Sequence, residues 1–225
     1  MKDDVIKNKY LMCAYKKSLS NFRVMTVGDI VRNNWKPGVH IEKYVVKYIR
    51  KQGEVLLIAN PILKYIPQIQ IRAVNPDLKK NRFTVRGSQS SIPYGFGMLN
   101  DNFEYGDWII MVEGVSDREA LVDIYPNVIA VLTDGISLKQ REVLKNLTDK
   151  FLIIYDNDEA GRKGFYRDRK ILNNMNKTVR GFKYPGDGDI EDPGDILQLE
   201  YEGKSFEADI AKDYFENYIN FVVRR

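Results

Sequence analysis

The sequence predicts an α/β fold, with a mainly parallel four-stranded sheet flanked by helices and a basic α+β subdomain before it. From residue 107 onward, apolar runs alternate with helix-like segments, which is typical of parallel sheets covered by helices. The charge also changes sign along the chain. Residues 1–105 carry 18 Lys and Arg against 8 Asp and Glu, whereas residues 106–225 carry 17 against 23. We therefore expect a basic subdomain over 1–105, the α/β domain over 106–195 and a helical tail over 196–225.

The basic half is predicted to begin with helices and to end in a hairpin. Apolar residues recur at helical spacing over 7–17 and 41–51, and 54–59 is a short apolar run. Residues 68–74 alternate apolar and polar side chains, and 81–86 provide a returning strand after a turn at Asn75-Pro76-Asp77. Basic residues cluster around this hairpin: Arg72, Lys79, Lys80, Arg82 and Arg86.

The acidic half predicts four strands and their connecting helices. The strands are the apolar runs at 108–112, 127–132 and 151–155 and the segment 178–184. Helical patterns lie between them over 117–125, 138–147 and 160–173, and a last helix is expected over 206–221. Continuous apolar strands indicate a sheet that is covered on both faces.

Acidic residues follow three of the four strands. Glu113 ends the first strand, Asp156 and Asp158 follow the third, and Asp192 and Asp195 come after the fourth. Because the carboxyl ends of parallel strands lie at one edge, these carboxylates should converge and raise one another's pKa. The sequence places too few Lys or Arg beside them to balance the charge, so a divalent metal is the natural partner. Taken singly, an Asp-x-Asp motif is more often a turn or a helix cap than a metal site.

The cysteine and histidine content limits the kinds of metal ion that the chain could bind. One cysteine, Cys13, and one histidine, His40, exclude an internal disulfide and a zinc ribbon. A metal would therefore be held by oxygen ligands, as Mg²⁺ or Mn²⁺ is. No apolar stretch is long enough to span a membrane, and the charged N-terminus lacks a signal-peptide pattern. We expect a cytoplasmic protein, in a bacterium or a phage-infected cell, with no zinc and no membrane partner.

The motifs at the strand ends resemble those of the Toprim domain, and within that superfamily those of bacterial-type (DnaG-like) DNA primases. The similar segments are VEGVSDREAL at 112–121, Gly135, YDNDEAGRKG at 155–164, and the stretch from EDPGD at 191–195 onward. The resemblance covers about residues 107–211, with a weaker one over 68–99. It implies a metal-dependent nucleotidyltransferase that makes short RNA primers on single-stranded DNA from NTPs.

The resemblance also implies roles for individual residues. Glu113 would be the general acid/base or would organise the metal, and Asp156, Asp158, Asp192 and Asp195 would be metal ligands. Asp117 would be an accessory ligand, although a solvated first-turn acid that stabilises its helix dipole is an equal alternative. The hairpin cations and Arg162 could contact template or triphosphate phosphates, or could be a solvated rim. We expect Phe83, Tyr94 and Phe96 to belong to the core, with base stacking as the alternative.

The chain also departs from full primases. It lacks their zinc ribbon, and only about 30 residues follow the last motif. These features suit a compact phage or mobile-element version that relies on a replicative helicase or a separate start-site-selecting factor. A Toprim nuclease and a non-catalytic nucleic-acid-binding protein are the alternative functions.

Overall fold

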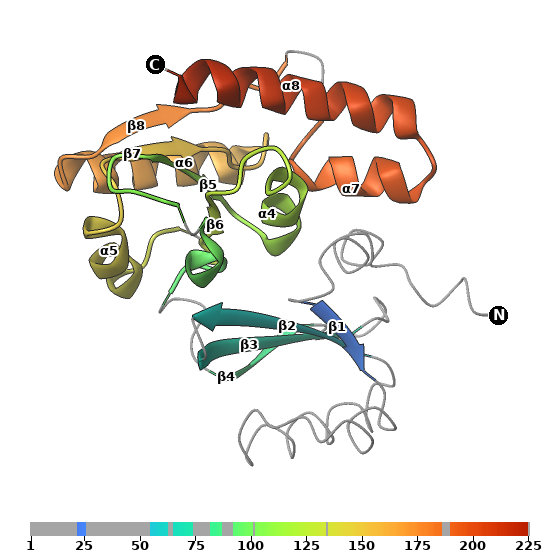
Figure 1. Cartoon of the computed structure of the whole chain (residues 1–225), viewed down its shortest axis with the longest axis horizontal. Coiled ribbons are helices and arrows are strands. Elements are labelled where there is room, and N and C mark those ends of the chain that lie inside the picture. Colours follow the sequence, from blue (N-terminus) through green and yellow to red (C-terminus); the bar gives the residue numbers. More distant parts are fainter. Residues whose placement is uncertain are drawn as a thin grey trace. The chain divides into compact units, whose positions relative to one another are not determined.

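The structure is a computed structural model that describes residues 92–100, 102–133, 135–185 and 190–224, together with the backbone of four earlier strands. The chain divides into two compact units, Met1–Ser88 and Gln89–Arg225. Figure 1 shows the elements of both units and their labels.

The first unit contains an antiparallel sheet. Its strands are β1 (Phe22–Met25), β2 (Val55–Ile62), β3 (Tyr65–Ala73) and β4 (Arg82–Arg86), in the order β1-β2-β3-β4. The predicted hairpin is confirmed, because β3 and β4 pair antiparallel and bring Arg72 opposite Arg82. Strand β1 was not predicted. The expected helices at 7–17 and 41–51 lie outside the described residues, as do Lys79 and Lys80.

The second unit is built on a parallel sheet. Its strands are β5 (Trp108–Val112), β6 (Val128–Ala130), β7 (Lys150–Ile153) and β8 (Thr178–Gly181), in the order β6-β5-β7-β8. Every neighbouring pair is parallel, so the predicted four-stranded parallel sheet is confirmed. All five residues of β5 are buried, as expected for a central strand with both faces covered.

Helices flank this sheet on both faces. They are α4 (Val115–Leu121), α5 (Leu138–Lys145), α6 (Glu159–Asn174), α7 (Gly194–Tyr201) and α8 (Ser205–Val223). Ile109 and Met111 of β5 share one core with Leu144 of α5 and Leu172 of α6. Because strand side chains alternate between faces, Ile110 and Val112 point to the other face, the side on which α4 packs against α7.

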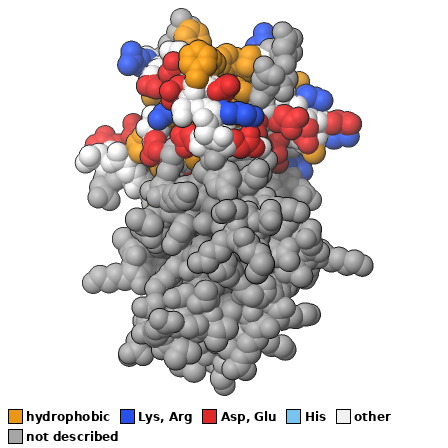
Figure 2. All heavy atoms as spheres, turned by 90° about the vertical axis from the view of Figure 1, so that its right-hand side faces the viewer, with side chains coloured by type: hydrophobic (Ala, Val, Ile, Leu, Met, Phe, Trp, Pro, Cys, Tyr) orange, Lys and Arg blue, Asp and Glu red, His pale blue; other side chains and the backbone are white. Residues whose placement is uncertain are grey.

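The predicted tail helix is present as α8 and packs onto the end of β8. Its buried residues recur at helical spacing: Ala208, Ala211, Phe215, Ile219 and Val222. The Phe215 ring stacks on Phe182 at 4.7 Å between centroids, and the Tyr218 hydroxyl donates to the carbonyl of Gly181 at 2.7 Å. The side of α8 away from this contact exposes Phe206 and Ile210, and Figure 2 shows hydrophobic side chains gathered at the top, over this helix.

The segment before β5 is anchored to the sheet. Tyr94 forms an isolated bridge with Ala130 of β6 and is fully buried, so its predicted place in the core is confirmed. Phe96 is half-buried in the short 3-10 helix Phe96–Met98, and the side chain of Phe83 lies outside the described atoms. Among the described residues, no helix combines the length and the apolar character needed to cross a membrane.

Candidate active site at the carboxyl edge of the sheet

Two neighbouring strands deliver carboxylates to the same edge. Glu113 follows β5 and Asp156 follows β7 by three residues. The two strands are paired in parallel, and the amide of Asp156 donates to Oε1 of Glu113 at 3.3 Å. The predicted convergence of Glu113 with Asp156 is therefore present in the structure.

Asp117 is held beside them by the start of α4. Its Oδ2 accepts from the amide of Gly114 at 2.7 Å. Gly114 is the N-cap residue of α4, so the Asp117 carboxylate reaches back from the first turn and caps its own helix. This contact explains why α4 begins at Val115 rather than at the predicted position 117. Only 5% of Asp117 is exposed, so the alternative of a solvated surface acid is wrong, although its place in the first turn of the helix is confirmed.

The turn before α7 brings two more acids to the edge. The amide of Asn157 donates to the carbonyl of Glu191 at 2.7 Å, which ties this turn to the end of β7. Asp195 folds the turn, because its Oδ2 accepts from the amides of Glu191 at 2.7 Å and Asp192 at 3.3 Å.

Gly194 marks the place where the turn meets α4. A Cβ added there would lie 2.7 Å from Oδ1 of Asp192 and 3.1 Å from Oδ1 of Asp117. The two carboxylates therefore face each other across a glycine that leaves them room.

Asp158 lies at the exposed end of the group. Its Oδ1 accepts from the amide of Gly161 at 2.6 Å, which makes Asp158 the N-cap of α6. The capping alternative for Asp-x-Asp is thus realised at Asp158. The cap uses one carboxylate oxygen, so the second oxygen stays available to a ligand.

The carboxylates behave as one electrostatic group. Burial raises the pKa of Asp156 to about 7, and the negative charges of Glu113, Asp158 and Asp195 contribute. Burial and the charges of Asp195 and Asp156 likewise raise the pKa of Asp192 to about 7. The edge is therefore short of positive charge at neutral pH.

Glu113, just before α4, and Asp117, in its first turn, also have raised pKa values. Burial raises the pKa of Glu113, and the charge of Asp158 adds to it. Burial, with the charges of Asp192 and Asp156, raises the pKa of Asp117 well above its ordinary value. These mutual effects link acids from the ends of two strands, a helix start and a turn.

The donor set suits a hard divalent cation. Within the described ranges, no three acidic, histidine or cysteine side chains stand closely enough to enclose a metal ion. Magnesium does not need such a cage, since it is usually held by one or two carboxylates and retains several waters or substrate oxygens. The residues that could hold it are Asp156, Asp192 and Glu113, all of which supply oxygen.

A cation that the sequence did not reveal lies at the same edge. Arg167 on α6 lowers the pKa of Glu113, and its Nε donates to the buried carboxylate of Asp168 at 3.1 Å. Its guanidinium occupies the space that a Cβ on Gly135 would take, and Gly135 has φ of +143°. Gly135 belongs to the loop after β6, so the arginine is brought to the edge by a contact between distant segments.

Asp168 holds this arrangement from within. It is fully buried and accepts from the Tyr155 hydroxyl at 2.7 Å and from the Ile136 amide at 3.2 Å. It thereby connects α6 to the end of β7 and to the loop that carries Gly135. Arg167 and Asp168 follow the acidic motif in the helix, but no local pattern distinguishes them from surface charges.

The predicted basic residues divide between the two units. Arg162 lies on α6 beside the acids, exposed, with its Nη1 3.4 Å from the carbonyl of Asn157. Arg72, Arg82 and Arg86 lie on β3 and β4, which are described by their backbone. Their roles therefore stay predictions.

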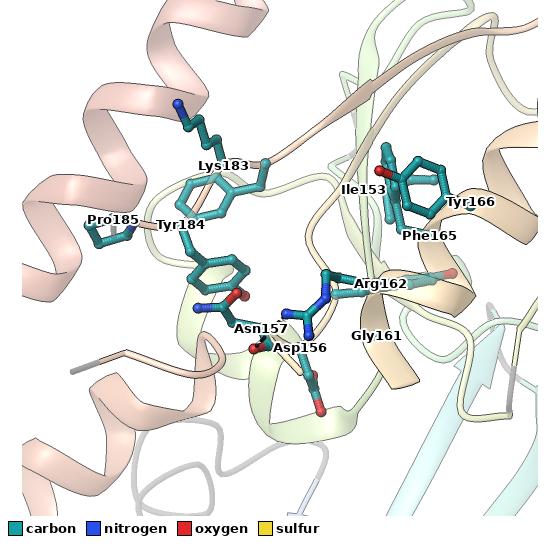
Figure 3. A pocket seen from close by; sticks show the side chains of 12 residues that line it. Ile153, Asp156, Asn157, Gly161, Arg162, Phe165, Tyr166, Lys183, Tyr184 and Pro185 are labelled. Atoms are coloured by element: carbon teal, nitrogen blue, oxygen red, sulfur yellow. Dashed lines mark hydrogen bonds between the residues drawn. The ribbon is translucent and has the colours of Figure 1, made fainter. Parts of the chain in front are cut away.

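Tyr184 is a further residue that sequence reasoning missed. Its hydroxyl is buried and has no hydrogen-bond partner among the described residues. Burial raises the pKa of Tyr184, with further contributions from Asp117, Asp192 and Asp156. Figure 3 shows the side chain pointing toward Asp156 and Asn157. Its position at the end of the predicted strand 178–184 carries no sequence signal for such a role.

The fold and the acidic edge correspond to a known domain type. A family model described as Toprim-like matches residues 110–197, a segment that begins within β5 and ends within α7. Searches of curated protein sequences find no match. Residues 110–197 thus form a Toprim domain, as the motifs predicted.

Solved structures add the likeness to primases. A DNA primase domain from Pseudomonas aeruginosa is 25% identical, with a TM-score of 0.54 over 65% of this chain and 47% of that one. The DnaG primase catalytic domain bound to single-stranded DNA is 16% identical, with a TM-score of 0.60 over 89% of this chain and 69% of that one. The Escherichia coli primase catalytic core is 20% identical, with a TM-score of 0.53 over 70% and 51%. The chain therefore spans about half of the Pseudomonas and Escherichia structures, and its fold is that of primase catalytic cores.

Proposed function

We propose that this Toprim-domain chain is the catalytic core of a DNA primase, which makes short RNA primers on single-stranded DNA from NTPs. The observation that supports it most is the convergence of Glu113, Asp156 and Asp192 at one edge of the sheet, with their pKa values raised by burial and by one another. A group of carboxylates that repel each other is costly to a protein that only binds nucleic acid. It suits a site that works with a cation.

The proposed roles follow from position. Asp156 and Asp192 hold the metal, assisted by Asp158 and Asp195, while Asp117 supports them from the first turn of α4. Bound Mg²⁺ would offset the charge of the triphosphate and of the transition state. Glu113 orients Asp156 through its amide and accepts the proton as the primer 3′-hydroxyl attacks the α-phosphorus and pyrophosphate leaves.

Positive residues complete the proposed site. Arg167, beside Glu113, and Arg162, on the first turns of α6, lie on the acidic edge and can bind phosphate oxygens of the nucleotide. The first unit contributes Arg72, Lys79, Lys80, Arg82 and Arg86 toward the template backbone, which would make binding to single-stranded DNA depend on salt. A replicative helicase or a separate start-site factor is proposed to supply what the catalytic core does not.

Primer synthesis tests this function directly. Purified protein is incubated with labelled single-stranded DNA, NTPs and Mg²⁺ or Mn²⁺, and the products are resolved by length. New short RNA strands would support the proposal. Shortened DNA would indicate a metal-dependent nuclease, and an unaltered but shifted strand would indicate binding alone; either result contradicts it.

Two carboxylate-to-amide variants sharpen the assay. Asp156→Asn removes a proposed metal ligand with almost no change of shape, and it should abolish synthesis while binding of single-stranded DNA stays near the wild-type value. Asp209→Asn is the matched control, since Asp209 is exposed on α8 and is not among the charges that raise the pKa values of these acids. Undiminished synthesis by the Asp156 variant would remove that residue from the proposed site.

A further inference from the structure

A cavity of about 350 Å³ opens beside the acidic edge, between the ends of β7 and β8 and the start of α6. This volume falls within the roughly 300–1,000 Å³ of small-molecule sites. Asp156 lies both on the wall of the cavity and in the group of carboxylates. A ligand in the cavity would therefore extend directly toward the proposed metal.

The walls of the cavity are aromatic. Phe165 and Tyr166 come from α6, and Phe182 and Tyr184 from the segment after β8. The Phe182 and Tyr184 rings meet edge to face at 4.8 Å, and Phe165 lies directly on Gly181, where a Cβ would come within 2.6 Å of its ring. Tyr166 is 67% exposed at the rim. Such walls offer flat faces on which a ring can stack.

Polar groups gather at one side of this aromatic cavity. Figure 3 shows Asp156, Asn157, Arg162 and Tyr184 lying close together there, with Phe165 and Tyr166 apart from them. The Tyr184 hydroxyl is buried without a partner among the described residues, and Asn157 brings a side-chain amide that can donate and accept. A ligand with a flat ring and a polar edge would satisfy these groups.

The charges at the rim identify the rest of the ligand. Arg162 and Lys183 are both exposed and positive, and Figure 3 shows Arg162 beside Asp156 and the Lys183 side chain pointing away from it. Anionic groups attached to the ring would meet Arg162 and a cation held by Asp156. A planar heterocycle with attached phosphates is a nucleotide.

We propose that this cavity binds the base of a mononucleotide whose phosphates extend to the metal at the acidic edge. Phe165 and Tyr166 stack on the base, and the Tyr184 hydroxyl and Asn157 bind its polar edge. The inference deepens the proposed function, on which it rests, because it assigns the place of the base in the same site.

Calorimetric titrations in Mg²⁺ test the contribution of the base. Each of the four NTPs is compared with inorganic tripolyphosphate, which carries three phosphates without a base. Wild-type protein should bind at least one NTP about tenfold or more tighter than tripolyphosphate, given what one stacked base contributes. Equal affinities for all NTPs and tripolyphosphate would overturn the proposal.

Three variants test whether the preference for NTPs over tripolyphosphate arises in the cavity. Tyr166→Ala and Tyr184→Phe should weaken NTP binding toward that of tripolyphosphate and leave tripolyphosphate binding unchanged. Tyr105→Ala is the matched control for Tyr166→Ala, because Tyr105 is 63% exposed and does not line the cavity. The proposal fails if the control loses as much affinity as Tyr166→Ala, or if both cavity variants bind NTPs as the wild type does.

Two further arms separate this inference from the proposed function and from strand binding. If wild-type protein binds neither NTPs nor tripolyphosphate, the metal site fails, and nucleoside binding by ligand-observed NMR then decides the cavity. Nucleoside binding that Tyr166→Ala abolishes would support the cavity as the base site, whereas no nucleoside binding would overturn the inference. The inference is also overturned if Tyr166→Ala weakens binding of a single-stranded oligonucleotide but not of NTPs, because the cavity would then hold a base of the strand.

Discussion

The amide nitrogen of Asp156 lies 3.3 Å from Oε1 of Glu113, although the two residues are 43 positions apart in the chain. The parallel pairing of β5 and β7 produces this contact, because it ends both strands at the same edge. One carboxylate is thereby fixed against the backbone that carries the next. The acidic edge is a direct result of the sheet topology.

The raised pKa values predict how stability depends on pH without metal. Asp156 and Asp192 have their pKa raised from 3.8 to about 7 in the folded protein. The folded state therefore holds protons that the unfolded chain releases above about pH 4, so this contribution to stability is lost as pH rises from about 4 through about 7. Thermal unfolding in chelator should give a Tm for Asp192→Asn that rises relative to wild type between pH 5 and pH 8.

Added Mg²⁺ should reverse the same effect. Because the cation binds ionised carboxylates, it should raise the Tm of the wild type more at pH 8 than at pH 5 and have less effect on Asp192→Asn. A Tm difference between the two proteins that stays constant over this pH range would contradict the proposed coupling among the acids.

Gly135 is predicted to be intolerant of a side chain. Its φ of +143° is unfavourable for other residues, and the Arg167 guanidinium fills the space of a Cβ. Gly135→Ala should lower the free energy of unfolding by about 1–3 kcal/mol or more, measured by chemical denaturation. Gly106→Ala is the control, because Gly106 has φ of +103° with nothing within 4 Å of the added Cβ.

Comparing the two glycine variants separates the effect of displacing Arg167 from the effect of backbone strain. The Gly106 variant carries backbone strain alone, whereas the Gly135 variant also displaces Arg167. Since Arg167 lowers the pKa of Glu113, the Glu113 carboxyl should titrate at higher pH in Gly135→Ala, as followed by NMR. Equal losses of stability in the two variants, together with an unchanged Glu113 pKa in Gly135→Ala, would show that the position of Arg167 does not depend on Gly135.

A buried ion pair is predicted to hold the segment before β5. Arg118 and Glu119 are each 2% exposed, and Nη1 of Arg118 lies 2.6 Å from Oε1 of Glu119. The Tyr94 hydroxyl donates to the same Oε1 at 3.2 Å. Glu119→Ala leaves the arginine buried without its partner and should cost about 3–5 kcal/mol of unfolding free energy. Glu159→Ala, which breaks the exposed pair with Lys163, should cost less than about 1 kcal/mol. Similar losses in both would contradict this account.

The sequence predicted the sheet well because its signals are local. The run at 108–112 matches β5, and the carboxylates fall where parallel strands must end. The helix α4 was placed two residues late, since the contact from Asp117 back to Gly114 extends its start. Predicted 178–184 exceeds β8 because Phe182 and Tyr184 leave the sheet to pack with Phe215 on α8.

The missed residues depend on contacts between distant segments. Arg167 acquires its place from Gly135, which is 32 positions away, and the aromatic cavity combines a helix with the end of a strand. Short-range patterns of charge and hydropathy do not encode such pairings. The side chains of Arg167 and Tyr184 therefore became visible as candidates only in the folded chain.

Metal binding by the acidic edge is the most direct test of the central claim. Isothermal titration calorimetry with Mg²⁺ compares wild-type protein with Asp156→Asn, each with and without NTP. We predict that wild type binds the ion, that NTP strengthens this binding, and that Asp156→Asn loses both. Wild-type protein that binds no ion with or without NTP, or an Asp156 variant that binds it as tightly as wild type, would contradict the assignment of this edge as a nucleotidyl-transfer site.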